Sequence, residues 1–179
     1  MINYEVENSP FFEANKNYVE SIEGKMKTLN AECTGFCNCF GYDVETSVSR
    51  NGLEYELKFH KHQSTQNGVV VPVNSNIYSG TEVRVKGLNR NAKVSIGKSK
   101  FMRLFAPKMV KDLFESPYYM KSNFTPDSGL LEDLAKKIKT DRISMLSLSD
   151  GQLTIKIHVQ TEDPLALMAD LEKLTKNWK

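Results

Sequence analysis

Hydrophobic and polar positions follow two different periods along this chain. Apolar residues recur three or four positions apart in some segments, which predicts amphipathic helices, and alternate with polar residues in others, which predicts strands. The helical segments begin near Pro10, Pro107, Asp127 or Ser128, and Pro164. The first and last of these prolines follow Ser9 and Asp163, which are typical N-cap residues. The longest predicted helix covers residues 10–30.

Two alternating stretches contain the turn dipeptides of tight β-hairpins. Asn51-Gly52 joins one pair of alternating segments, and Asp150-Gly151 joins another. Both dipeptides accept the positive φ angles that a two-residue type I′ turn requires. Counting outward from Asn51-Gly52 places Val44 opposite Phe59 on an apolar face and leaves polar side chains on the other. We expect the apolar face to pack and the polar face to be exposed or functional.

Shorter runs predict further strands. Residues 83–85 and 94–96 alternate with basic residues on both sides of a turn over residues 87–91, which predicts another hairpin. Residues 69–73 are β-branched but contain a proline, so they predict at most an edge strand. Residues 118–124 predict one more strand.

The order of these elements predicts the fold class. Antiparallel β-hairpins with amphipathic helices packed on one side indicate an α+β fold rather than alternating βαβ units. The length of 179 residues fits one domain. The polar, glycine-containing stretch over residues 74–80 predicts a loop and is the best candidate for a subdivision. We therefore expect a single domain over residues 1–179.

The charge is distributed unevenly. Residues 83–111 contain nine basic side chains and no acidic one, so the remaining 15 basic and 22 acidic residues give the rest a formal charge of −7. The net charge of +2 hides this asymmetry. The segment predicts an anion-binding surface formed by Arg84, Lys86, Lys93, Lys98, Lys100, Arg103 and Lys108.

Several partners fit such a segment, and a solvated face without a partner fits as well. An anionic partner is nucleic acid, an anionic lipid surface or an acidic protein. Phe101 and Phe105 alternate with basic residues, which suits base stacking or shallow membrane contact and equally suits aromatic side chains packed inward from a strand. Oligomeric state does not follow from these patterns.

Cysteine and histidine offer a second candidate site. The three cysteines lie within seven positions, and their odd number without an export signal favours reduced thiols in the cytoplasm. If the first hairpin continues past Gly41, Cys37 and Cys39 fall on the same face as His60 and His62. Thiolate and imidazole ligands in a set of four suit Zn²⁺. Zinc is therefore the alternative to a protein without a cofactor, in a metal-dependent role such as that of a hydrolase.

Catalytic signatures are weak in this sequence. Gly97-Lys98-Ser99 matches the end of a phosphate-binding loop, but alanine stands where the loop requires its first glycine, and we expect no helix to begin at Lys98. No Gly-x-Ser-x-Gly elbow is present. No long apolar run predicts a transmembrane helix, and no leader is expected at the start. These observations favour a binding module over an enzyme.

The second half of the chain also resembles a known family. The resemblance covers residues 80–178 and rests on four segments, KSKFMRLF from Lys98, YYMKS from Tyr118, LLEDL from Leu130 and ISMLSLSDGQLTI from Ile143. Their order resembles uncharacterised bacterial proteins in which a domain of unknown function often follows membrane helices. This chain departs from that pattern because it has no such helices. The resemblance implies a bacterial module that lies in the cytoplasm or at the inner membrane surface, and it transfers no catalytic residue.

Overall fold

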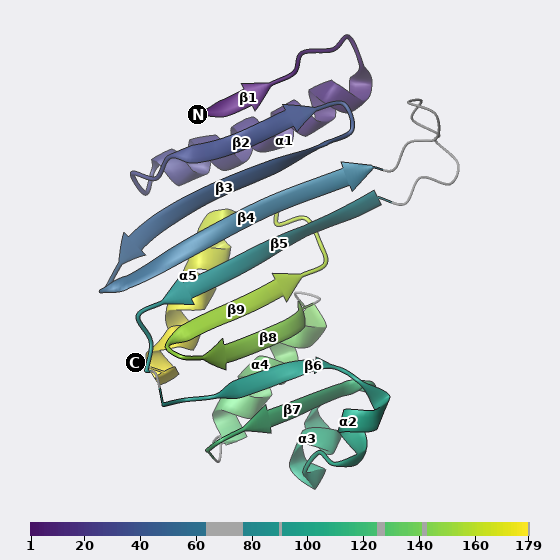
Figure 1. Cartoon of the computed structure of the whole chain (residues 1–179), viewed down its shortest axis with the longest axis vertical. Helices are drawn as coiled ribbons and strands as arrows, with labels where there is room; N and C mark the ends of the chain where they lie inside the picture. The colour runs from purple at the N-terminus through teal and green to yellow at the C-terminus, as the bar shows by residue number, and fades with distance from the viewer. Residues whose placement is uncertain (64–76, 90, 125–127, 141–142, 179) are drawn as a thin grey trace.

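A single nine-stranded sheet runs through the whole of the computed structural model (Figure 1). The structure describes residues 1–63, 77–89, 91–124, 128–140 and 143–178. The strand order is β1-β2-β3-β4-β5-β9-β8-β6-β7, and among the described strands only β1 and β2 pair in parallel. The elements in chain order are β1 (Ile2–Tyr4), α1 (Pro10–Lys27), β2 (Cys33–Asn38), β3 (Gly41–Arg50), β4 (Leu53–Gln63), β5 (Ile77–Lys86), β6 (Val94–Lys98), α2 (Lys100–Leu104), α3 (Lys108–Leu113), β7 (Tyr118–Ser122), α4 (Ser128–Thr140), β8 (Ile143–Ser149), β9 (Gln152–Ile157), α5 (Pro164–Thr175) and a short 3₁₀ helix (Lys176–Trp178).

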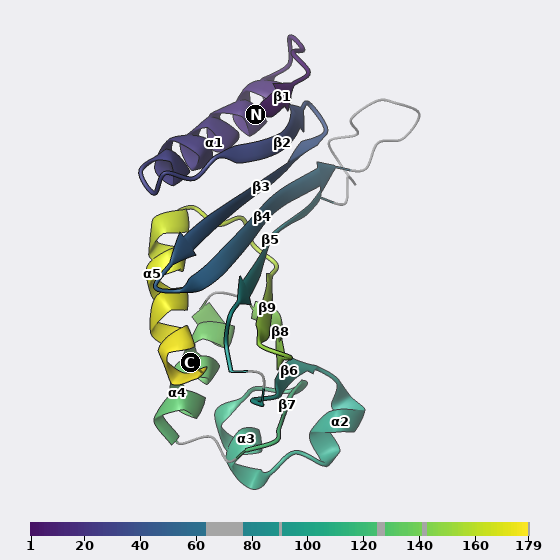
Figure 2. The same cartoon turned by 60° about the vertical axis from the view of Figure 1, so that its left-hand side comes forward.

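The long helices cover one side of this sheet, as Figure 2 shows for α1, α4 and α5. Alternate side chains of the strands are buried beneath them, so that Leu57 and Phe59 of β4 are almost fully enclosed. Helix α1 contributes Val19 and Ile22 to the same core. No helix among the described residues covers the opposite side of strands β3 to β5, which we call the open side of the sheet (Figure 2). The α+β class, with antiparallel hairpins and helices on one side, is confirmed.

Local signals in the sequence account for the best-defined elements. The Ser9 side chain accepts a hydrogen bond from the Phe11 amide, and the Asp163 side chain accepts one from the Leu165 amide. Asn51 and Asp150 have φ angles of 53°, as type I′ turns require. The predicted register of the first hairpin, including the Val44–Phe59 pair, is confirmed.

The hairpin predicted over residues 83–96 is wrong. Strand β5 pairs with β4 and β9, whereas β6 pairs with β7 and β8, so the β8–β9 hairpin lies between them. After β5 the chain passes the turn of this hairpin at Leu88, which donates its backbone N–H to the Gly151 oxygen. Alternation predicts both strands correctly but says nothing about which neighbours they pair with.

Other differences concern short or ambiguous segments. Residues 77–80, predicted as part of a loop, form the beginning of β5. The proposed edge strand over residues 69–73 and the start of the proposed boundary at residues 74–76 lie outside the described residues. The pattern also missed β1, β2 and α2, each of which has at most six residues and too few periods for a clear signal.

Candidate anion-binding surface

Two of the predicted anion-binding residues lie on the open side of the sheet among carboxylates. Arg84 and Lys86 are on β5, where the register brings them opposite Glu56 and Glu54 of β4. The Arg84 guanidinium lies 3.1 Å from Glu82, and the Lys86 ammonium contacts Glu56 directly. Hydrogen bonding to Glu56 raises the pKa of Lys86. The structure therefore neutralises both cations within the sheet.

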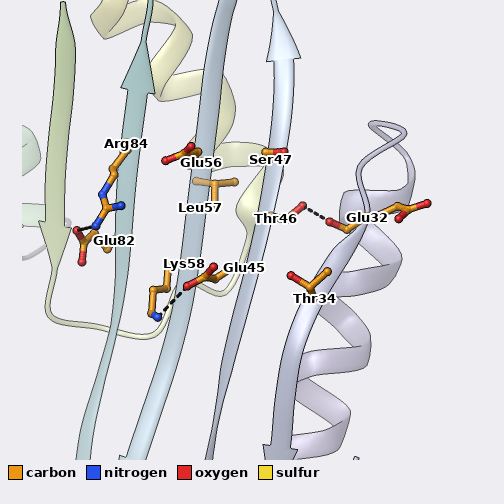
Figure 3. A pocket seen from close by; sticks show the side chains of 10 residues that line it. All are labelled: Glu32, Thr34, Glu45, Thr46, Ser47, Glu56, Leu57, Lys58, Glu82 and Arg84. Atoms are coloured by element: carbon orange, nitrogen blue, oxygen red, sulfur yellow. Dashed lines mark hydrogen bonds and ion pairs between the residues drawn. The ribbon is translucent and has the colours of Figure 1, made fainter. Parts of the chain in front are cut away.

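The same open side contains a depression of about 650 Å³ beside these residues (Figure 3). Four carboxylates and two cations line it, namely Glu32, Glu45, Glu56, Glu82, Lys58 and Arg84. The Lys58 ammonium is 2.9 Å from both Asp43 and Glu45, and these hydrogen bonds raise its pKa. A surface with this excess of negative charge does not favour an anion.

The other predicted residues come later in the basic segment than Arg84 and Lys86. Helices α2 and α3 lie beside β7, at the edge of the sheet farthest from β1 (Figure 1). We call residues 98–122, from the end of β6 through β7, the α2–α3 lobe. Ser99 caps α2 by accepting a hydrogen bond from the Met102 amide at 3.2 Å. No helix begins at Lys98, as expected, but the short helix α2 begins two residues later, at Lys100.

Two basic side chains hold the lobe together. The Arg103 guanidinium donates to the backbone oxygens of Tyr118 at 2.7 Å, Lys111 at 2.9 Å and Glu115 at 3.4 Å. The Lys111 ammonium donates to the Leu104 oxygen at 3.0 Å, so α2 and α3 are joined in both directions. The bonds to the Lys111 and Leu104 oxygens satisfy carbonyl groups near the C-terminal ends of the two short helices. Arg103, predicted to bind an anion, thus has a structural role.

Four lysines of the lobe are exposed and have no acidic partner among the residues that the structure describes. They are Lys98, Lys100, Lys108 and Lys121. The Lys98 ammonium lies 5.2 Å from the centroid of the Tyr118 ring, a cation–π contact. Lys121 was not among the predicted residues, because it follows the continuous basic run by ten positions. Lys93 is likewise exposed, immediately before β6.

The same lobe also exposes several apolar side chains. Phe101, Leu104 and Phe105 of the α2 region are 67–73% exposed, and Met109 of α3 is 42% exposed. The Phe101 and Phe105 ring centroids are 5.3 Å apart in an edge-to-face arrangement. Inward packing from a strand, one of the two expectations for these rings, is therefore wrong. Helix α2 contributes no fully buried residue, and its Phe101 and Leu104 are exposed.

An apolar groove of about 400 Å³ continues this exposed surface. Phe105 and Met109 form one part of its lining, and the buried side chains Val110, Met120 and Leu131 form another. Lys121 also lines it. The lobe therefore combines apolar surface and unpaired positive charge.

The predicted zinc residues do not share a face of the sheet. Cys37 pairs with Tyr42, and both are buried on the helix-covered side, whereas His60 pairs with Asp43 on the open side. The convergence is wrong because the chain reverses direction after Asn38, so Cys37 belongs to a separate strand.

The surroundings of these residues differ accordingly. Burial raises the pKa of Cys37 and of Cys39 to about 11, whereas zinc requires thiolates. The rings of His60 and His62 stack on the open side with centroids 6.3 Å apart. Within the described ranges, no group of three or more Cys, His, Asp or Glu side chains is arranged to hold a metal ion. Zinc binding stays a prediction from the sequence.

Comparison with known protein families, with curated proteins and with solved structures found no significant match for this chain. The resemblance of residues 80–178 to a bacterial family accordingly stays a prediction. Among the helices described, none is both long enough and apolar enough to cross a membrane.

Proposed function

We propose that this chain is a non-enzymatic binding module of the bacterial cytoplasm whose α2–α3 lobe binds an anionic partner. The observation that carries the proposal is the set of four exposed lysines, Lys98, Lys100, Lys108 and Lys121, without acidic partners among the described residues. Positive charge without a local counterion attracts anions and increases their rate of association.

Contrast within the molecule supports this choice of surface. Arg84 and Lys86 belong to the same basic run, but carboxylates within 4 Å neutralise them. In the lobe, Glu115 is 3.2 Å from Lys139 of α4 and is thereby paired with a cation outside the lobe. The lobe has six basic side chains against two acidic ones, Asp112 and Glu115, and therefore has positive charge available for a partner, whereas the open side of the sheet does not.

The cytoplasmic location is part of the same proposal. Cys33, Cys37 and Cys39 are free and buried, as is usual for proteins of a reducing compartment. The absence of a catalytic motif in the sequence supports a role in binding.

Binding to polyanions at several salt concentrations tests the proposal. We expect the protein to bind heparin and duplex DNA at low salt and to lose affinity as the salt concentration rises. For the duplex, the slope of the logarithm of the binding constant against the logarithm of the salt concentration should be about −0.9 for each phosphate contact. The double variant Lys100→Glu with Lys108→Glu should lose most of this binding. Both positions begin helices, where a carboxylate interacts favourably with the helix dipole, so folding should be preserved.

A matched variant separates local charge from net charge. Lys173→Glu with Lys176→Glu makes the same change in net charge on two exposed lysines of the C-terminal helices. This control should keep most of the affinity. Equal losses in the two variants, or no binding by the wild type, would contradict the proposal.

A further inference from the structure

The exposed apolar side chains of the lobe indicate a partner, whereas exposed lysines by themselves do not. Phe101, Leu104, Phe105 and Met109 lie within nine positions, and they are half of the large hydrophobic side chains that are exposed in the described residues. Single exposed apolar residues are common on proteins, but a contiguous group bordered by polar residues marks an interaction surface. The Phe101–Phe105 contact shows that at least these two are contiguous.

The chemistry of these apolar side chains discriminates between the candidate anionic partners. Bases of nucleic acid stack on aromatic rings, but Leu104 and Met109 have no ring to offer. The acyl boundary of a bilayer accepts aliphatic and aromatic side chains alike, while lysine ammonium groups stay at the level of the headgroups. Both kinds of side chain occur together in the lobe, where Lys100 directly precedes Phe101 and Lys108 directly precedes Met109.

We propose that the α2–α3 lobe docks on the surface of an anionic bilayer. Phe101, Leu104, Phe105 and Met109 enter the boundary between headgroups and acyl chains. The four lysines of the lobe bind the lipid phosphates around them. This inference rests on the proposed function, since it assigns the anionic partner of the same surface.

The internal bonds of the lobe suit such docking. Arg103 and Lys111 connect α2, α3 and the start of β7 through hydrogen bonds to backbone carbonyls. These bonds fix the backbone from which the apolar side chains project. The groove lined by Phe105 and Met109 continues the apolar surface beyond α2. A surface that is already ordered before contact loses less conformational entropy on binding.

Co-sedimentation with vesicles and a fluorescent reporter test the inference. Vesicles of phosphatidylcholine alone are compared with vesicles that contain about 30% phosphatidylglycerol, whose negative surface potential attracts basic residues. The reporter is Phe101→Trp in a Trp178→Phe background, because Trp178 is buried and would otherwise contribute to the emission. We expect binding to the anionic vesicles, weak binding to the neutral ones, and a blue shift of the Trp emission on binding.

Variants identify which part of the lobe carries the effect. Leu104→Ser with Phe105→Ser should lower affinity for anionic vesicles about tenfold or more, because bilayer binding scales with the apolar area inserted. The same variant should retain its affinity for duplex DNA and heparin. The matched control is Val6→Ser with Phe11→Ser, which removes two exposed apolar side chains of the N-terminal region and should change neither affinity. Thermal unfolding of each variant verifies that it folds.

The outcomes distinguish this inference from the proposed function. Binding to DNA and heparin without binding to anionic vesicles would overturn the inference and leave the proposed function intact. Vesicle binding that the Leu104→Ser and Phe105→Ser changes do not reduce, or that produces no blue shift, would also overturn the inference, since contact would then be electrostatic alone. Binding to none of the polyanions or vesicles would contradict both.

Discussion

The open side of the sheet and the α2–α3 lobe carry cations from one basic run in opposite surroundings. On the sheet, Arg84 and Lys86 lie next to Glu82 and Glu56. In the lobe, Lys100 and its neighbouring lysines are exposed beside apolar side chains. Residues that are close in sequence therefore belong to two different electrostatic surfaces.

The comparison also applies to hydrophobic residues. Phe59 of β4 is fully buried, whereas Phe105 of the lobe is 73% exposed. Burial of a phenylalanine stabilises a fold by about 1.5–3 kcal/mol, and its exposure forgoes that stabilisation. Buried apolar side chains hold the sheet together, whereas those that the lobe exposes are available for a partner. The predictions below test this contrast.

The largest expected effect concerns these two phenylalanines. Phe59→Ala should lower the free energy of unfolding by about 3–5 kcal/mol, because it leaves a cavity in the core. Phe105→Ala should change that energy by less than about 0.5 kcal/mol. Urea unfolding monitored by circular dichroism measures both. A loss above about 1 kcal/mol for Phe105→Ala would show that the lobe uses its apolar surface for its own stability.

Cysteine reactivity sharpens the contrast on the helix-covered side of the sheet. Because burial raises the pKa of Cys37 to about 11, its thiolate fraction at pH 8 should be about two orders of magnitude below that of a free cysteine. A disulfide reagent should therefore react slowly with the native protein and quickly in urea. Fast reaction of the native protein would mean that this side of the sheet opens readily.

Zinc analysis of the same sample tests the Cys/His site. We expect less than one ion per chain.

Within the lobe, Arg103→Ala should have an intermediate effect. The change removes charge-assisted hydrogen bonds to the Tyr118 and Lys111 carbonyls, and we expect a loss of about 1–3 kcal/mol that is confined to the lobe. Amide hydrogen exchange should show reduced protection in α2, α3 and β7 while β3 and β4 keep theirs. Lys100→Ala, which removes a lysine without such bonds, is the control and should leave exchange unchanged. Equal exchange in both variants would remove the structural role assigned to Arg103.

The smallest expected effect is a pH dependence on the open side of the sheet. Burial, together with the neighbouring His62, lowers the pKa of His60, so the folded state favours the neutral ring. The unfolded chain binds this proton more readily, and the associated stability is present above the unfolded pKa of about 6.5 and is lost as pH falls through the lower folded pKa. Urea unfolding is measured from about pH 7.5 to about pH 5, a range that spans the pKa of about 6.5. The free energy of unfolding should fall more steeply with decreasing pH for the wild type than for His60→Gln. Parallel curves would mean that His60 titrates as in the unfolded chain.

Local patterns in the sequence determined the elements whose causes are local. The Asn51-Gly52 and Asp150-Gly151 turns, the register they impose, and the caps at Ser9 and Asp163 all depend on residues a few positions apart. The α+β class follows from the order of these elements. The sequence also showed the basic run and the placement of Phe101 and Phe105 among basic residues, but it did not show which side chains lie near them.

Tertiary structure alone decided which strands are neighbours and which side chains reach the surface. Strand β5 pairs with β9, about seventy positions later, so no local period could predict that the β8–β9 hairpin separates β5 from β6. The same strand pairing placed Glu56 beside Lys86 and put Cys37 and His60 on opposite faces. The four exposed lysines of the lobe have no acidic partner among the described residues. The physical reason is that charge neutralisation and burial depend on distances in space, and the sheet sets those distances through contacts between segments far apart in the chain.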